Sequence, residues 1–316
     1  MRGAALPLLL VGLAAGEEVI SRLERIKLRE ETRELFYHGY SNYMEHAFPS
    51  DVLQPGQCTG AEDWGGISMT LLDTLDTLAL MNNASEFERG VRWVIKNIDF
   101  DVDETVSLFE TNIRALGGLL AAHLMAADHS LGLMSEPYPE SESYGGGLLP
   151  LALDLGNRLL PALNTESGVP FGSINLRRGV AATESPITCT AAAGTLVLEF
   201  GALTRLTGDG RFEAAARRAA VALWSQRSEL DLLGAHLSLK TGAWTQADAG
   251  IGRGIDSFYE YMLKGSMLFN EPDYLAMFHD SYHAVTPSGA RTVANPVPHA
   301  PTGQPWRGPL HVSRGC

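Results

Sequence analysis

The feature that most constrains the fold is a recurring pair of apolar helical segments joined by a short polar turn. Apolar residues recur at helical spacing over residues 18–285. One pair covers 190–207 and 212–226, with Gly208-Asp209-Gly210 as its turn, and a later pair begins with 257–269. Repeated antiparallel helix pairs build either a solenoid or a closed toroid. The chain is therefore predicted to be all-α, with about nine helices.

The remaining segments refine this architecture. Helices are also predicted over 68–81, 107–127 and 148–160. Residues 234–243 differ, because they have the pattern of a small β-hairpin with Thr241-Gly242 near its turn. Hairpins inserted between helix pairs favour a toroid whose loops build a pocket at one end.

The two ends of the chain predict segments outside this domain. Arg2, the apolar run 4–15 and the small residues before Glu17 occur in the order of a secretory signal peptide, which we place at residues 1–16. The alternative is an apolar start to the first helix. Residues 17–286 are then the helical domain. Residues 287–316 contain six prolines and no acidic residue, so we expect a disordered tail without a packed core.

Charge excludes several classes of partner. The chain has 24 basic and 37 acidic residues, a net charge of −13, and no basic stripe. A nucleic-acid-binding surface needs clustered Lys and Arg, so this function is not expected. No segment after the signal region has the roughly 20 apolar residues that a membrane span requires. A neutral or weakly charged substrate fits this composition better.

Cysteines and sequons add little on their own. Three cysteines, Cys58, Cys189 and Cys316, are too few for a disulfide scaffold, and they form no Cys-x-x-Cys pair that would indicate zinc. In an oxidising compartment, Cys58 and Cys189 could pair with each other or with a partner protein, and the sequence does not choose. Asn83-Ala84-Ser85 is a possible N-glycosylation site.

The first candidate for chemistry is the pair Glu110 and Arg114, four residues apart on one helix face. Gly117-Gly118 follows inside the same apolar helix, at a cost of about 1 kcal/mol per glycine relative to alanine. That cost predicts close backbone packing. Spacing alone favours an exposed salt bridge over a catalytic role.

The second candidate is Asp256, which follows the glycine-rich stretch 250–254 and opens a helix. Such glycines can cradle a phosphate, but no P-loop lysine follows. Without further information a structural N-cap is favoured. Glycoside hydrolysis needs two carboxylates around one sugar, and spacing does not show that Glu110 and Asp256 meet. Asp73 and Asp76 interrupt another apolar helix and are interpreted as structural, and His123 is interpreted as a core residue.

These motifs together resemble glycoside hydrolase family 47, the class I α-1,2-mannosidases. The resemblance rests on Phe36-Tyr37-His38-Gly39-Tyr40, on Ser68-Met69-Thr70-Leu71-Leu72-Asp73-Thr74-Leu75-Asp76-Thr77-Leu78, on Phe109-Glu110-Thr111-Asn112-Ile113-Arg114 and on Asp256-Ser257-Phe258-Tyr259-Glu260-Tyr261. Thr188-Cys189-Thr190-Ala191 and Glu199-Phe200 resemble its branch of endoplasmic-reticulum (ER) degradation-enhancing α-mannosidase-like proteins. The motifs occur in one order over residues 35–284.

The resemblance implies an (α/α)7 toroid, here incomplete, that removes α-1,2-linked mannose with inversion. Glu110 matches the acid-side carboxylate, Asp256 a second catalytic carboxylate, and Arg114 a substrate-binding arginine beside the acid. The implied cofactor is calcium. The implied partners are high-mannose N-glycans on misfolded glycoproteins in the ER lumen, together with a thioredoxin-fold oxidoreductase.

Several family motifs do not occur in this sequence. They are the Arg-Met-Glu-Ser-Phe-Phe motif with the third catalytic carboxylate, the Leu-Arg-Pro-Glu motif, and the Thr-Glu-Ala-His motif with the calcium threonine. No metal ligand is therefore predicted in this chain, and we expect it to be weakly active or inactive. The alternatives are a non-catalytic adaptor that binds mannose glycans or misfolded clients, and a helical scaffold without a role in sugar chemistry.

Overall fold

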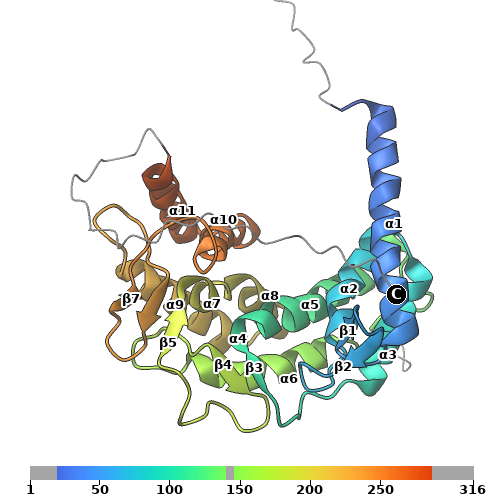
Figure 1. Cartoon of the computed structure of the whole chain (residues 1–316), viewed down its shortest axis with the longest axis horizontal. Helices are drawn as coiled ribbons and strands as arrows, with labels where there is room; N and C mark the ends of the chain where they lie inside the picture. Colours follow the sequence, from blue (N-terminus) through green and yellow to red (C-terminus); the bar gives the residue numbers. More distant parts are fainter. Residues whose placement is uncertain (1–19, 140–145, 287–316) are drawn as a thin grey trace, which may run out of the picture. The chain divides into compact units, whose positions relative to one another are not determined.

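The computed structural model describes residues 20–139 and 146–286 (Figure 1). The predicted signal peptide and the predicted tail at 287–316 lie outside these residues, so both stay predictions. The chain divides into two compact units, the first ending at Ser41 and the second beginning at Asn42. Each unit is described by itself.

The described part of the first unit consists of helix α1 (Arg22–His46), which continues into the second unit. Most of its side chains up to Ser41 are exposed, including Leu23 and Leu35. Phe36 and Tyr40, one turn apart, stack with their ring centroids 5.7 Å apart. The helical periodicity of this segment is confirmed.

The second unit contains eight helices of more than ten residues among its described residues. They are α2 (Met69–Leu80), α3 (Ala84–Asn97), α5 (Gly117–Ala127), α6 (Leu149–Leu159), α8 (Val197–Thr207), α9 (Arg211–Ser225), α10 (Asp256–Phe269) and α11 (Pro272–Val285). With α1 they make the nine helices expected. Shorter helical segments are α4 (Leu108–Glu110), the π-helix η1 (Thr111–Leu116), η2 (His129–Leu131), η4 (Leu160–Leu163) and α7 (Thr190–Gly194).

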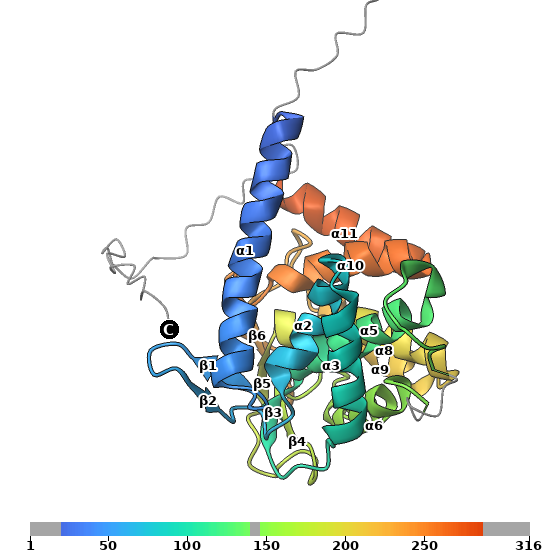
Figure 2. The ribbon, with the colours of Figure 1, turned by 90° about the vertical axis from the view of Figure 1, so that its right-hand side faces the viewer.

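These helices form two rows. In the first row α2 contacts α5, α5 contacts α8, and α8 contacts α10. Each of these helices also packs against the next long helix in the chain, so α3, α6, α9 and α11 form the second row (Figures 1 and 2). Three of the turns within pairs contain a residue in the left-handed backbone conformation, namely Asn82, Gly208 and Asn270. This conformation ends a helix and satisfies its last carbonyls, which explains the polar turns.

Small antiparallel sheets complete the second unit. The strands are β1 (Val52–Gln54), β2 (Thr59–Ala61), β3 (Thr105–Ser107), β4 (Ser173–Asn175), β5 (Ile187–Cys189), β6 (His236–Ser238) and β7 (Trp244–Gln246). β1 pairs with β2, β3 with β4, and β6 lies between β5 and β7. The hairpin expected over 234–243 is confirmed as β6–β7, with Gly242 in the left-handed region at its turn.

One predicted helix is interrupted. Residues 190–207 form α7 and α8, with a break at Thr195 and Leu196. At the break the Thr195 hydroxyl donates to Ser257 Oγ at 2.8 Å, and the Thr195 carbonyl accepts from Asn112 Nδ2 at 3.2 Å. These long-range bonds use groups from residues distant in the chain, so local periodicity could not reveal the break.

The core interpretation of His123 is confirmed. The imidazole is 8% exposed, and its Nδ1 lies 3.0 Å from the hydroxyl of Tyr138. That hydroxyl also accepts from the backbone N–H of Leu148 at 2.7 Å. Burial lowers the pKa of His123 and raises the pKa of Tyr138 to about 12, so both side chains are neutral structural groups at pH 7.

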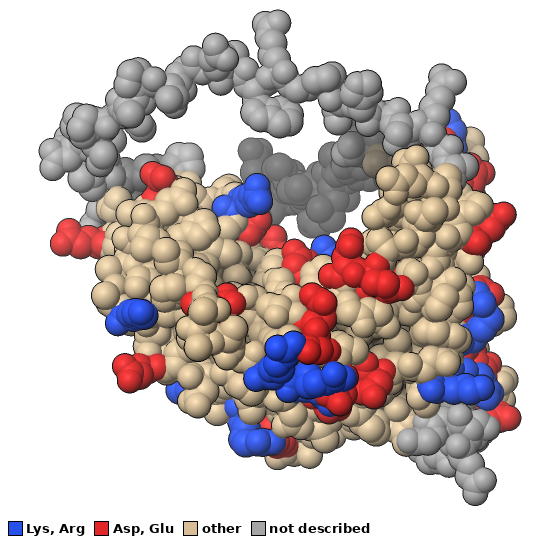
Figure 3. Space-filling view, turned by 60° about the horizontal axis from the view of Figure 1, so that its bottom comes forward, with Lys and Arg blue, Asp and Glu red and all other residues tan. Residues whose placement is uncertain are grey.

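Charged groups on the surface lie mostly in mixed clusters. Figure 3 shows basic side chains in small groups beside acidic ones on the face in view. Asp101 accepts from Arg158 and Arg177, and Asp103 pairs with Arg178. Within 20–139 and 146–286, no helix is both long and apolar enough to cross a bilayer.

The close packing predicted at the glycine pair is confirmed for Gly118. A Cβ at this position would lie 2.5 Å from the backbone oxygen of Leu72 on α2. A glycine here therefore lets the backbones of α2 and α5 approach each other. In exchange, the helix loses the stability that an alanine would give it at this position.

We expect Gly118→Ala to lower the free energy of unfolding by about 2–3 kcal/mol, because the added methyl group overlaps a backbone atom that cannot rotate away. Gly39→Ala is the matched control, since a Cβ at this helical position meets nothing within 4 Å. It should be neutral or stabilising by up to about 1 kcal/mol. Urea unfolding followed by circular dichroism measures both, and equal effects would contradict the packing argument.

Candidate active site

Glu110 stands where a strand passes into an unusual helix. β3 ends at Ser107, whose Oγ accepts a hydrogen bond from the backbone N–H of Glu110 at 3.3 Å and caps the short helix α4. The chain then winds as the π-helix η1 before the regular helix α5. Short π-helical segments inside α-helices are rare and often occur at functional sites. The sequence pattern predicted a continuous helix here and did not reveal the π-helix.

The Glu110 side chain belongs to a cluster of three charges. Arg114 Nε donates to Glu110 Oε2 at 2.7 Å, and Arg114 Nη1 donates to Asp73 Oδ2 at 2.9 Å. The three side chains are 33–43% exposed, so water can reach them. The hydrogen bond that Arg114 donates to Glu110 is the largest influence raising the pKa of Arg114, and burial partly offsets it. The predicted salt bridge is present, and Asp73 adds a bond from the neighbouring helix α2.

Asp256 is the first residue of α10, and it follows Gly254, which has a φ of +90°. The N-cap is Ile255, without a side-chain cap, so the interpretation of Asp256 as the N-cap is wrong by one residue. Its Oδ1 accepts from the N–H of Ser257 at 2.9 Å. A carboxylate in the first helical turn is stabilised by the helix dipole.

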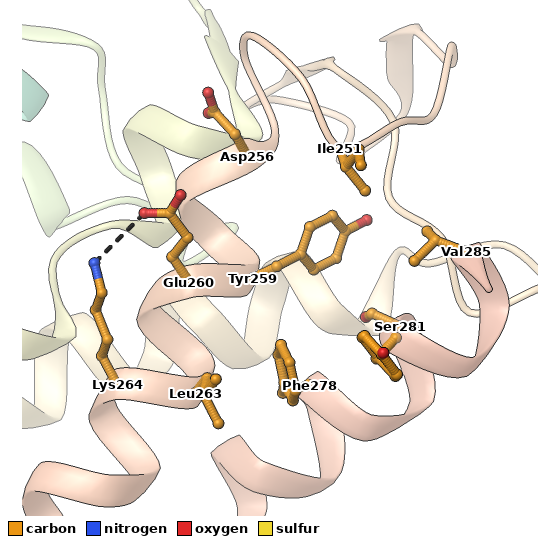
Figure 4. Close-up of a pocket in the computed structure, with 10 residues that line it drawn as sticks. Ile251, Asp256, Tyr259, Glu260, Leu263, Lys264, Phe278, Ser281 and Val285 are labelled. Atoms are coloured by element: carbon orange, nitrogen blue, oxygen red, sulfur yellow. Dashed lines mark ion pairs between the residues drawn. The ribbon is translucent and has the colours of Figure 1, made fainter. Parts of the chain in front are cut away.

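Asp256 lies at the edge of a cavity of about 380 Å³ between α10 and α11. Figure 4 shows its carboxylate directed away from Tyr259, whose hydroxyl points toward Ile251 and Val285. Glu260, one turn later, forms an ion pair with Lys264 at 3.5 Å. Glu110 is not among the residues that line this cavity. A single hollow shared by Glu110 and Asp256 therefore stays a prediction.

Hydrogen bonds nevertheless connect the segments that carry Glu110 and Asp256. Asn112, two residues after Glu110, bonds to the carbonyl of Thr195, whose hydroxyl bonds to Ser257. The N–H of Ala191 donates to the carbonyl of Gly254 at 2.8 Å. Both carboxylates thus belong to short or beginning helical segments, α4 and the start of α10, and both of these helices contact α7.

Glu199 is a site residue that reasoning from spacing missed. It is 8% exposed, and its carboxylate accepts from Asn112 Nδ2 and from the hydroxyl of Tyr261, both at 2.7 Å. Burial raises its pKa to about 7 against the lowering effect of these bonds. The available signal was the one acidic residue of α8, which lies among the apolar residues Val197, Leu198 and Phe200. Perturbed carboxylates of this kind are candidates for functional groups.

The structure tests neither the metal prediction nor the modification prediction. Among residues 20–139 and 146–286, no three His, Cys, Asp or Glu side chains are placed to hold a metal ion. Calcium as the cofactor stays a prediction. Asn83 Oδ1 accepts from the N–H of Glu86 at 3.3 Å and caps α3. Glycosylation of Asn83 stays a prediction.

One of the two cysteine alternatives is corrected. Cys189 carries a free thiol, so it is not paired with Cys58. Cys189 ends β5, and its Sγ accepts from the N–H of Ala192 at 3.3 Å as the N-cap of α7. A bond between Cys189 and a partner protein stays a prediction.

Comparison with known proteins decides the lineage. Residues 35–298 match glycosyl hydrolase family 47. This chain belongs to that family. The match runs past residue 286, where we placed the end of the helical domain, and that boundary stays a prediction.

Relatives of this family 47 chain are mannosidases and related proteins. It is 51% identical to alpha-mannosidase I MNS4 of Arabidopsis thaliana over 261 residues. The matched region covers 83% of this chain and 41% of that relative. It is 45% identical to ER degradation-enhancing alpha-mannosidase-like protein 2 of Mus musculus over 257 residues. Here the matched region covers 81% of this chain and 44% of the relative. The chain thus spans less than half the length of these relatives.

A solved structure supports the fold. The alpha-1,2-mannosidase from Trichoderma reesei superposes with a TM-score of 0.72 at 27% identity, covering 80% of this chain and 53% of that chain. The two rows of helices in the family 47 chain are therefore part of an α/α toroid.

The high pKa of Glu199 predicts how the stability of the fold depends on pH. The folded state holds this proton up to about pH 7, whereas the unfolded state releases it near 4.5. The stabilising contribution is complete below pH 4.5 and is lost as pH rises through 7, a change of roughly 3 kcal/mol. Glu199→Gln should therefore gain stability relative to the native chain between pH 5 and 8.

Urea unfolding of both proteins at several pH values measures this gain. The exposed Glu229 provides the matched control, and Glu229→Gln should change the free energy of unfolding far less than Glu199→Gln does. A difference for Glu199→Gln that does not vary with pH would contradict the proton uptake assigned to Glu199.

Proposed function

We propose that this chain carries the acid side of an α-1,2-mannosidase site that trims mannose from N-glycans on misfolded glycoproteins in the ER lumen. The observation that carries the proposal is the cluster of Glu110, Arg114 and Asp73 at the π-helix, inside the range matched to family 47. The names of the relatives supply the bond type, the pathway and the compartment.

Two features of Glu110 support its proposed role as the general acid. Its carboxyl group is partly exposed, so it can reach the oxygen of a leaving sugar from the surface of the first row. Arg114 holds one of its oxygens, which fixes the orientation of the carboxyl group. A guanidinium has five N–H donors, so Arg114 keeps donors for sugar hydroxyls beside the scissile bond. Arg114 is thus the proposed substrate-binding residue.

Asp256 is the proposed second carboxylate. An inverting glycosidase places its two carboxyl groups on opposite sides of the sugar, far enough apart to admit a water molecule. Asp256 comes from a different helix pair than Glu110, and α8 lies between α5 and α10 in the first row. That arrangement suits two groups that face a sugar from separate sides.

Substitution of the acid tests catalysis. We expect Glu110→Gln to lower the rate of mannose release from α-1,2-mannobiose at least 100-fold, because a general acid contributes about 10²–10⁴ in rate. Binding of the disaccharide, measured by calorimetry, should change less than about threefold, since the amide preserves shape. Glu229→Gln should leave both quantities unchanged. Unaltered release by Glu110→Gln would exclude Glu110 as the acid.

Replacement of the arginine tests substrate binding. Arg114→Ala should weaken disaccharide binding about 10-fold or more, because hydrogen bonds to a charged group contribute about 1.5–3 kcal/mol. Degradation of a reporter glycoprotein in cells then separates the enzyme from the adaptor. Degradation that persists with Glu110→Gln but fails with Arg114→Ala would favour a glycan-binding adaptor over a mannosidase.

A further inference from the structure

The segments η1, α8 and α10 meet at one buried carboxylate. Glu199 projects from α8, receives a hydrogen bond from Asn112 of η1 on one side, and receives another from Tyr261 of α10 on the other. Its Cγ also lies 3.7 Å from the position that a Cβ would take at Gly117, which is an ordinary van der Waals distance. No other carboxylate among the described residues is hydrogen-bonded in this way to both η1 and α10.

The two donors connect Glu199 to both candidate catalytic groups. Asn112 follows Glu110 by two residues within the same short helical stretch, and Tyr261 follows Asp256 by five residues on α10. A movement of the Glu199 carboxylate therefore displaces both helices. Hydrogen bonds of 2.7 Å to a buried acceptor are strong and directional, so they transmit such a displacement.

We infer that Glu199 is a positioning residue, which sets the separation between the Glu110 carboxyl group and the Asp256 carboxylate by holding η1 and α10 together. The inference rests on the proposed function, because the separation matters only if both groups act on one sugar. Glu199 itself does not touch substrate in this account.

The surroundings of Glu199 also make this link sensitive to protonation. From η1 and α5 it faces uncharged groups, Asn112 and Gly117. From α10 it faces the hydroxyl of Tyr261, and the positive charge of Lys264 acts on it from the same helix, while Glu260 acts on Tyr261. Burial outweighs these influences and keeps the pKa of Glu199 near 7.

Protonation changes what the carboxyl group can accept. The ionised group accepts from Asn112 and Tyr261 with a full negative charge, and a protonated group accepts more weakly and carries a donor of its own. The link between η1 and α10 is thus expected to loosen as pH falls below 7. Both candidate catalytic groups should sense that change.

Catalysis tests the inference with two substitutions. Glu199→Ala removes both bonds and should lower the turnover number of mannose release about 10- to 100-fold with little change in KM, because misplaced catalytic groups lose rate. Glu199→Gln resembles the protonated side chain, so it should match the native chain at pH 5.5 and differ from it at pH 8. A pH profile identical to the native one, with Glu229→Gln as the control, would overturn the inference.

Carboxyl carbon NMR separates this inference from the proposed function, because it needs no turnover. In protein labelled with ¹³C at the Asp and Glu carboxyl carbons, spectra of Glu110→Gln, Asp256→Asn and Glu199→Gln assign the three signals. We expect the Glu110 and Asp256 signals to inflect at the pH where Glu199 titrates. Tyr261→Phe should remove the inflection from Asp256 while Glu110 retains it.

The two kinds of failure are distinguishable. If the native chain releases no mannose but both inflections appear and vanish in Glu199→Gln, the positioning role holds and the proposed function fails. If the native chain releases mannose but neither signal responds to Glu199, the function holds and the positioning role is overturned. Inflections that persist in Glu199→Gln also overturn it.

Discussion

The hydrogen bonds of the Glu199 carboxylate hold together the part of the molecule on which its proposed chemistry depends. Burying an ionisable group is unfavourable unless its oxygens are satisfied, and here Asn112 and Tyr261 satisfy them from two different helices. The same contacts bring the beginning of η1 toward α10. Thr195 adds a second connection through Ser257 and Asn112. A polar cluster therefore joins η1, α8 and α10.

Around this cluster, the architecture follows from simple packing rules. Each apolar helix buries one face against its partner and another against its neighbour in the row, so the core runs between the two rows. Gly118 allows α2 and α5 to approach at backbone distance, which leaves the Asp73 side chain within reach of Arg114. The charged cluster at Glu110 is thus a consequence of how closely two helices pack.

Several predictions from the sequence succeeded because they depended on local patterns. The helix pairs, their polar turns and the hairpin near Gly242 are encoded by residues adjacent in the chain. The family motifs around Glu110 and Asp256 were visible for the same reason. Patterns among neighbouring residues did not predict the helix break at Thr195 or the π-helix after Glu110, where residues distant in the chain form hydrogen bonds. The N-cap of α10 was displaced by one residue, within the usual uncertainty of helix ends.

By itself, the sequence determined the helical class, the pairing of helices and the lineage, and it supplied Glu110, Arg114 and Asp256 as predicted site residues. Only the tertiary structure showed that Asp73 shares Arg114 with Glu110, that Cys189 is free, and that Glu199 is buried between two helices. The physical reason is the range of the interactions. Periodicity and turn chemistry act over a few residues, whereas ion pairs and buried hydrogen bonds join residues 41 to 87 positions apart, and spacing in the chain carries no information about them.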